Sequence, residues 1–301
     1  MGTIKGTRMS TPADRPAAAQ LARALVAESS DLVSLPEVAT AIIRLAEDPR
    51  STARDFETVI AGDPNLAARL LRIANSSYYS MRGRIDTIQR AVAVIGTLDV
   101  CNLAIGLSTV RAFDGIPIEV VSMDDFWTHS VYCSVLSRRF ARDAAPGREG
   151  TLFLAGLLHD VGQLLIFLRR PEEARKALWM VMEGADDLTA DVAERSVLGF
   201  DHGDVGDQLG RKWHLPDLLR ECMALHHSPG LASAPNAVAV AIVHVANSLA
   251  YLAETDSTEL ETAPLIDPAA ARLANFDAAL LPDLVADSRA QVAEARSLFG
   301  I

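Results

Sequence analysis

His159 and Asp160 are neighbours in FLAGLLHDVGQLLIF, residues 153–167, where every other residue except Gln163 is apolar or glycine. Adjacent side chains of a helix diverge by about 100 degrees, so both can reach one ion only near a helix end. An unpaired carboxylate is costly in such surroundings, whereas a metal ion would supply the compensating charge and accept a neutral imidazole. A hydrogen-bonded structural pair is the alternative interpretation of this dipeptide.

Further residues of metal-binding type occur on both sides of this pair. Asp125 and His129 in MDDFWTHS are four apart, which places a carboxylate and an imidazole on one face of a predicted helix. The other candidates are His202 in FDHGDVG, His226 and His227 in ALHHSP, and Asn247 in VHVANS. As a set, these nitrogen and oxygen donors suit iron, manganese or zinc. His214 is interpreted as a helix-end residue and His244 as a core or supporting residue.

The elements that must position these residues are predicted to be helices, because almost every segment has helical periodicity and strand signals are nearly absent. Pro36 and Pro64 occupy first turns, Asp63 can accept hydrogen bonds from the free amides that follow it, and Asn75 ends that helix. Residues 254–263 are predicted to form a surface loop. Further helices are predicted over residues 15–29, 52–61, 86–95, 98–110, 123–142, 149–168, 171–183, 189–197, 202–213, 216–227, 235–253 and 281–298.

A break at residues 113–117 separates a part of the chain without histidine from a part that holds all seven. We therefore predict an all-α fold with two helical lobes, residues 15–115 and residues 116–301. Half of the residues are hydrophobic and only 5% are aromatic, which favours close packing of helices with small and aliphatic side chains.

The composition argues against several classes of function. With 28 basic and 39 acidic residues, the formal charge is -11, which disfavours nucleic-acid binding through phosphates. The three cysteines lie far apart and are expected to be buried, reduced thiols. The first residues carry no signal-peptide pattern, and the apolar stretches are expected to be buried helices rather than membrane spans. These features predict a cytoplasmic protein.

Several motifs, in order along the chain, resemble those of HDOD domains, the HD-related output domains. SLPEVATAIIRLAEDPRSTARDFETVIAGDPNLAARLLRIANSSYYS and IDTIQRAVAVIGTLDVCNLAIGLS are similar to the front half of that family. FWTHS, LAGLLHDVGQL, FDHGDVG, RKWHLP, LHHSP and VHVANSLA are similar to its second lobe, a version of the HD phosphohydrolase fold. The resemblance implies an all-helical, two-lobed bacterial signalling module whose second lobe is an HD-like bundle with a C-terminal helical extension.

The resemblance also implies a set of metal ligands. In the related HD-GYP phosphodiesterases, the ligands are a glutamate and a histidine one turn apart, an HD pair, a single histidine, a histidine pair and an aspartate. They correspond here to Asp125 and His129, His159 and Asp160, His202, His226 and His227, and Asn247. The chain departs from that pattern because Gln163 replaces a lysine, Asn247 replaces an aspartate, and SPGLASAPN follows the histidine pair in place of a DGxGYP signature.

Two functions remain open. The preferred one is a signalling module that acts by protein or ligand binding and keeps an HD-type metal-binding cleft. Its expected partner is a signalling protein in trans, such as a cyclic-dinucleotide enzyme, a receiver or a chemotaxis component, with a nucleotide as a further candidate ligand. The alternative is a metal-dependent phosphohydrolase or phosphodiesterase that acts on a nucleotide or cyclic dinucleotide, with Asp160 as a bridging ligand or base.

Overall fold

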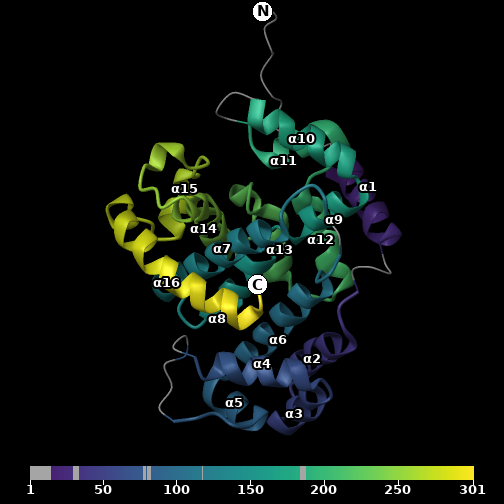
Figure 1. Cartoon of the computed structure of the whole chain (residues 1–301), viewed down its shortest axis with the longest axis vertical. Helices are drawn as coiled ribbons and strands as arrows, with labels where there is room; N and C mark the ends of the chain where they lie inside the picture. Colours follow the sequence, from purple (N-terminus) through teal and green to yellow (C-terminus); the bar gives the residue numbers. More distant parts are fainter. Residues whose placement is uncertain (1–14, 30–33, 77–78, 80–82, 117, 184–187) are drawn as a thin grey trace, which may run out of the picture.

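Helices carry the regular structure of the computed structural model, which describes residues 15–29, 34–76, 79, 83–116, 118–183 and 188–301 (Figure 1). No β-strand occurs within those ranges, so the all-α prediction is confirmed. The helices are α1 (Arg15–Glu28), α2 (Glu37–Glu47), α3 (Ala53–Ala61), α4 (Pro64–Ala74), α5 (Ile88–Ile95), α6 (Thr97–Ala112), α7 (Met123–Ala144), α8 (Glu149–Leu158), α9 (Val161–Arg169), α10 (Pro171–Glu183), α11 (Ala190–Leu198), α12 (His202–Lys212), α13 (Asp217–Leu225), α14 (Ala237–Glu254), α15 (Pro268–Leu273) and α16 (Leu281–Phe299), with short 3-10 turns η1 (Pro229–Leu231), η2 (Leu260–Thr262) and η3 (Ala278–Leu280).

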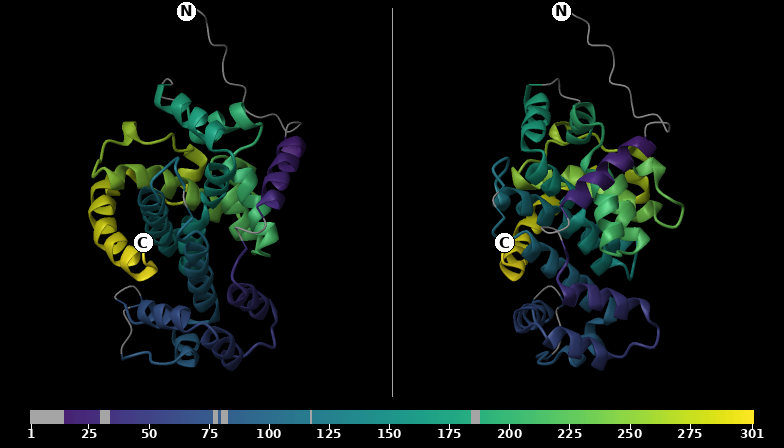
Figure 2. Two further views of the ribbon diagram at one scale, coloured as in Figure 1. Left: turned by 45° about the vertical axis from the view of Figure 1, so that its right-hand side comes forward. Right: turned by 90° about the vertical axis from the view of Figure 1, so that its right-hand side faces the viewer.

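A small lobe at one end of the molecule is formed by α2 to α5, which pack on one another and on α6 (Figure 2). Its centre contains Ile42, Ile60 and Leu70, one from each of α2, α3 and α4, and all three are fully buried. The connection to the rest of the protein is α6, which also packs on α8. Every residue of α6 from Val100 to Val110 is buried, as expected for a helix with apolar neighbours on all sides.

Helix α1 packs on the larger lobe, although the sequence pattern assigned it to the first lobe. Residues 15–115 are expected to form one lobe, but α1 packs against α12 and α9, in the part of the protein that holds the histidines. Ala18, Ala22 and Leu25 provide the buried stripe for this contact. Arg169 Nη2 donates a hydrogen bond to the carbonyl oxygen of Glu28 at the end of α1, at 3.0 Å. A stripe of this kind fits any apolar partner, so its spacing does not identify the partner.

The larger lobe is centred on α7, which packs against both α8 and α14. Gly156 makes the close approach of α8 to α7 possible, because a Cβ there would lie 2.7 Å from the Cα of Ser134. Almost all of α14 from Ala239 to Ala253 is buried. Cys101, Cys133 and Cys222 are buried free thiols, in agreement with their predicted state.

Two segments, Glu149–Arg169 and Ala237–Glu254, are long and apolar enough to cross a membrane, and the bent pair of α5 and α6 would count as a third. In each of the two segments, 78% of the tested window is buried inside the protein. Their apolar side chains therefore form the core.

The predicted helix ends are confirmed where a capping residue defines them. Asp63 Oδ1 accepts from the backbone N–H groups of Asn65 and Leu66, both at 3.1 Å, so it caps α4. Asn75 follows the last residue of that helix. One predicted helix, residues 149–168, is instead two, because the chain turns at His159 and Asp160 between α8 and α9. The short helix α15 was not predicted.

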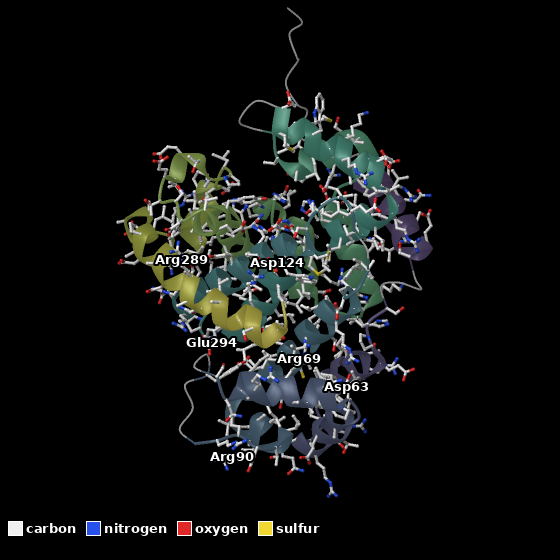
Figure 3. All side chains as sticks on the ribbon, in the orientation of Figure 1. Asp63, Arg69, Arg90, Asp124, Arg289 and Glu294 are labelled. Carbon is white, nitrogen blue, oxygen red and sulfur yellow. The ribbon has the colours of Figure 1, made fainter. Side chains whose placement is uncertain are left out.

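The final helix, α16, runs along α7 and reaches the small lobe at α4. Arg296 Nη2 is paired with Asp124 Oδ1 on α7. Arg69 on α4 donates from Nη1 to the carbonyl oxygen of Phe299, at 2.9 Å. Arg69 and Asp124 accordingly lie on either side of the end of α16 in Figure 3, and the helix connects the two lobes.

Candidate metal centre

The turn between α8 and α9 places His159 and Asp160 at the centre of the larger lobe. His159 is fully buried and Asp160 is 8% exposed. Both residues lie at helix ends, where adjacent side chains can face the same space, as the sequence analysis requires. The site is therefore built on a break in an apolar segment.

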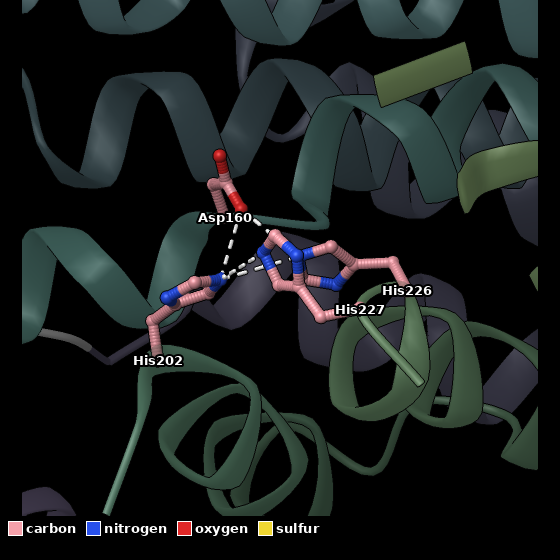
Figure 4. A group of neighbouring side chains, drawn as sticks. All are labelled: Asp160, His202, His226 and His227. Atoms are coloured by element: carbon pink, nitrogen blue, oxygen red, sulfur yellow. Dashed lines mark hydrogen bonds and ion pairs between the residues drawn. The ribbon is translucent and has the colours of Figure 1, made fainter. Parts of the chain in front are cut away.

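Four other elements bring their candidate residues to this turn. His202 is the first residue of α12, His226 and His227 directly follow α13, His129 lies on α7, and Asn247 lies on α14. The donor atoms form two groups, each within 4.8 Å, that share Asp160. One group, here called the first donor group, is Asp160 with His202, His226 and His227, and the second donor group is Asp160 with His129 and His159. Figure 4 shows how the three histidines of the first donor group converge on Asp160.

Asp160 turns one carboxylate oxygen to each donor group. Its Oδ1 lies 3.4 Å from His202 Nε2 and 3.2 Å from His226 Nε2. Its Oδ2 lies 3.1 Å from His159 Nε2 and 3.9 Å from His129 Nε2. A carboxylate in this position can bridge two bound cations.

Backbone carbonyl groups orient two of the histidines. His159 Nδ1 donates to the carbonyl oxygen of Gly156 at 2.8 Å. His226 Nδ1 donates to the carbonyl oxygen of Met223 at 3.0 Å. Because a carbonyl can only accept, Nδ1 of each ring carries a proton, and Nε2, which faces Asp160, is the nitrogen left to bind a metal ion once it is deprotonated. This is the orientation that a metal-binding imidazole requires.

Carboxylates orient two others. His202 Nδ1 donates to Oε2 of Glu194 at 2.7 Å, and the same oxygen accepts from the His202 backbone N–H at 2.8 Å. Gln163 Nε2 donates to the other oxygen of Glu194 at 3.1 Å. His129 Nδ1 lies 2.6 Å from Oε1 of Glu254. Carboxylates that hold the outer nitrogen of a histidine fix its tautomer and increase its basicity toward a metal ion.

Buried polar atoms at the centre of the cluster lack hydrogen bonds. His159 Nε2 and Asp160 Oδ1 have no hydrogen-bond partner among the described residues. His202 Nε2 lies 3.2 Å from His226 Nε2 and 3.1 Å from His227 Nε2. His202 has a single proton on Nε2 to donate, so it cannot fully satisfy both of these nitrogen atoms at once. A divalent cation would satisfy these atoms together, so the residues present fit a metal ion.

The electrostatics of the cluster favour an ionised Asp160 and a neutral His226, whereas His159 and His202 are held protonated. Burial acts against a charge on His159, but Asp160 outweighs burial and raises the pKa of His159 well above its usual value. Burial opposes a charge on Asp160, but His159, His226 and His202 outweigh burial and hold the pKa of Asp160 well below its usual range. Burial lowers the pKa of His226 to about 4, so this imidazole is neutral near pH 7. Burial also acts against His202, but Glu194 overcomes it and raises the pKa of His202 to about 10. A metal ion at His202 would therefore displace a proton.

The remaining predicted residues differ in position. Asn247 Oδ1 lies 2.9 Å from His129 Nε2, beside the second donor group. Asp125 is exposed in the first turn of α7 and contributes no atom to either donor group. His214 is exposed just beyond the end of α12, as predicted. His244 is buried, and its Nδ1 donates to the carbonyl oxygen of His226 at 2.7 Å, which is the supporting role expected of it.

Sequence reasoning missed the two carboxylates that hold histidines. Glu254 had a usable signal, because it lies seven residues after Asn247, two turns along one face of the same helix. Glu194 had none, since it lies on α11 and meets His202 only through the packing of α11 on α12.

Comparisons with known proteins give one family match and several similar folds. The model of the HDOD domain matches residues 32–229. A crystal structure of an HDOD domain protein of unknown function from Geobacter sulfurreducens has a TM-score of 0.71 at 22% identity, covering 94% of this chain and 97% of that chain. A Shewanella amazonensis SB2B protein, provisionally named a phosphohydrolase, has a TM-score of 0.71 at 23% identity over 92% and 98% of the two chains.

Two further proteins are similar to this chain at comparable sequence identity. A Marinobacter aquaeolei VT8 protein, provisionally named a signal transduction protein, has a TM-score of 0.71 at 23% identity and covers 98% of this chain and 68% of that chain. An uncharacterised protein of Treponema pallidum (strain Nichols) is 24% identical over 212 residues, or 69% of this chain. The match spans only 40% of the length of that relative. At these identities, the solved structures establish the fold.

Proposed function

The chain belongs to the HDOD domain family, and from that premise we propose that it is a bacterial signal-transduction module whose larger lobe binds divalent metal ions at the two donor groups. The first donor group would hold an ion through Asp160, His202, His226 and His227. The second would hold an ion through Asp160, His129 and His159, with Asn247 beside it. Mixed imidazole and carboxylate donors suit iron, manganese or zinc.

One observation carries the proposal. His159, His202 and His226, from three different elements, each turn Nδ1 to an acceptor and Nε2 toward Asp160. His129 turns Nδ1 to Glu254 and Nε2 to Asn247, with Asp160 at 3.9 Å. Histidines that only stabilise a core need not share one orientation around a carboxylate. Together with the unsatisfied buried atoms of His159 and Asp160, this shared orientation indicates a binding site for cations.

The metal content of the protein tests the proposal. Protein produced without a histidine tag is analysed for iron, manganese and zinc, beside a His159→Ala, Asp160→Ala double variant. The matched control is His214→Asn, because His214 is exposed outside the cluster and has φ of 57 degrees, which asparagine tolerates. Wild type and control should hold metal while the double variant does not. Equal metal content in all three proteins would refute the site.

A second candidate function, metal-dependent hydrolysis of a phosphate ester, is favoured by the position of Asp160 between the donor groups. Bound divalent ions would polarise phosphoryl oxygens and lower the pKa of water. Asp160 would stay ionised in contact with both groups, because its pKa is held well below the usual range by His159, His226 and His202 despite burial. Gln163 supplies no cation, because its amide is neutral, and it donates instead to Glu194.

Hydrolysis is tested by incubating metal-loaded protein with cyclic di-GMP, linear dinucleotides and nucleoside phosphates. Release of product by the wild type, absent from the double variant, would support the enzyme. If no substrate is turned over, the module acts by binding. Capture of a cyclic-dinucleotide enzyme, a receiver or a chemotaxis component by both proteins would then support a partner surface that does not depend on the metal.

A further inference from the structure

A second cluster of chemically active side chains lies between the two lobes, away from the donor groups. It lines a groove of about 570 Å³ whose two walls come from different lobes. Three of the eight lining residues are arginines, one is a histidine and one is acidic. The lining residues are Thr40, Ile43, Arg44 and Glu47 on α2, and Arg211, His214, Leu215 and Arg220 around the turn between α12 and α13. This is unusual on a chain with a formal charge of -11.

The groove has hydrogen-bond donors available to a ligand. Arg44 is exposed, and none of the described residues forms a hydrogen bond or an ion pair with its guanidinium group. Arg211 uses Nε to bind Asp207 Oδ2 at 2.8 Å. Its two Nη groups have no partner among the described residues, and the side chain is 53% exposed. Both arginines line the groove, so a phosphate there could accept hydrogen bonds from Arg44 and from the Nη groups of Arg211, which would keep its pair with Asp207.

The third arginine is held in place before any ligand binds. Arg220 Nη2 donates to Asp207 Oδ1 at 3.1 Å, and its Nη1 is paired with Asp217. The stem of Arg220 runs over Gly210, where a Cβ would lie only 2.6 Å from its Cγ. His214, which also lines the groove, has φ of 57 degrees, a left-handed backbone conformation. Such preorganisation lowers the entropy lost on binding.

We propose that this groove binds a phosphate-bearing ligand, which bridges α2 of the small lobe and the turn between α12 and α13 of the larger lobe. Arginine pairs with phosphate oxygens through two parallel N–H donors, which favours phosphate over a simple halide. The volume is in the range of small-molecule sites. Ile43 and Leu215 are buried, line the groove and offer an apolar contact to an organic group. No residue of the groove belongs to a donor group, so this site does not depend on the proposed metal centre.

Calorimetric titration tests the groove. The probes are inorganic pyrophosphate and ADP, which distinguish a bare phosphate site from a nucleotide site. The titrations use the His159→Ala, Asp160→Ala background with EDTA, so that no phosphate can bind through metal at the donor groups. Arg44→Glu and Arg211→Glu should each weaken binding by about 10- to 100-fold, the usual effect of losing a charged hydrogen bond. The matched control is Arg54→Glu, an exposed arginine on α3 outside the groove, which should bind as the background does.

Hydrogen exchange tests the bridge. A bound probe should slow exchange both in the last turn of α2 and in residues 211–215, and Arg44→Glu should abolish both effects. Failure of both probes to bind at millimolar concentration would overturn the proposal, as would equal binding by all variants. Slowed exchange on one wall alone would overturn the bridging geometry. None of these results depends on metal content, so this proposal and the proposed metal centre can fail separately.

Discussion

Glu194→Gln is expected to weaken metal binding at the first donor group while leaving the fold in place. In the wild type, Glu194 accepts from His202 Nδ1 at 2.7 Å, from the His202 backbone N–H at 2.8 Å and from Gln163 at 3.1 Å. A glutamine can keep its oxygen toward His202, and Gln163 can rotate its amide to accept from the new NH₂ group. The substitution therefore removes the negative charge and preserves the hydrogen bonds.

The size of the effect follows from the charges involved. A carboxylate that accepts from His202 Nδ1 makes the ring more basic, so it favours a metal ion as well as a proton on Nε2. The effect of Glu194 on proton binding is large: burial acts against a charge on His202, but Glu194 overcomes burial and raises the pKa of His202 to about 10. Losing a residue that orients a metal ligand weakens metal affinity by about 10- to 100-fold. In free energy this is about 1.4–2.7 kcal/mol.

The assay is competition for zinc or manganese with a chromophoric chelator at pH 7.5. Glu221→Gln is the matched control, because Glu221 is a glutamate whose carboxylate binds Ser233, away from the cluster. The control should bind metal as the wild type does. If Glu194→Gln also binds within twofold of the wild type, the orienting role of Glu194 is refuted.

Three further substitutions probe the scaffold. Asp63→Ala should cost about 1 kcal/mol of unfolding free energy near pH 7, as the loss of an N-cap does. The hydrogen bond from the Leu66 N–H is the main cause that holds the pKa of Asp63 below 3.8. The stabilisation is therefore present above pH 3.8 and is lost as the pH falls through the folded-state pKa. Denaturation at pH 7 and at pH 2.5 should show a smaller difference in unfolding free energy between wild type and variant at the lower pH. Gly162→Ala should destabilise by about 1–3 kcal/mol and reduce metal content, because the added methyl group would overlap the carbonyl oxygen of His202. His244→Leu should cost about 1–3 kcal/mol in urea unfolding, because it leaves a buried carbonyl and a backbone N–H without their partner.

The local features of the fold could be predicted because each depends on neighbouring residues. Helical periodicity and the cap at Asp63 need only the residues around them. The turn at His159 and Asp160 was not predicted, because the apolar pattern of residues 153–168 continues through it. Helix packing and the burial of two polar side chains decide that break, and neither is visible in the periodicity.

The sequence indicated most of the residues that gather in the candidate site, but it did not indicate how they are arranged. Residue type and the HDOD resemblance selected the histidines and Asp160, which the structure brings together. Asp125 shows the limit of spacing arguments, because it lies one turn before His129 and is nevertheless exposed. The roles of Glu194 and Glu254 depend on contacts between helices distant in the sequence, so only the packed structure reveals them.

Anomalous diffraction from crystals of the metal-loaded protein tests the central claim most directly. Data collected on both sides of the absorption edge of the added metal locate each ion without assumptions about its ligands. We predict peaks on the two sides of the Asp160 carboxylate, one at the Nε2 atoms of His202 and His226 and one at those of His129 and His159. Crystals that hold the metal only elsewhere, with these nitrogen atoms unligated, would contradict the account.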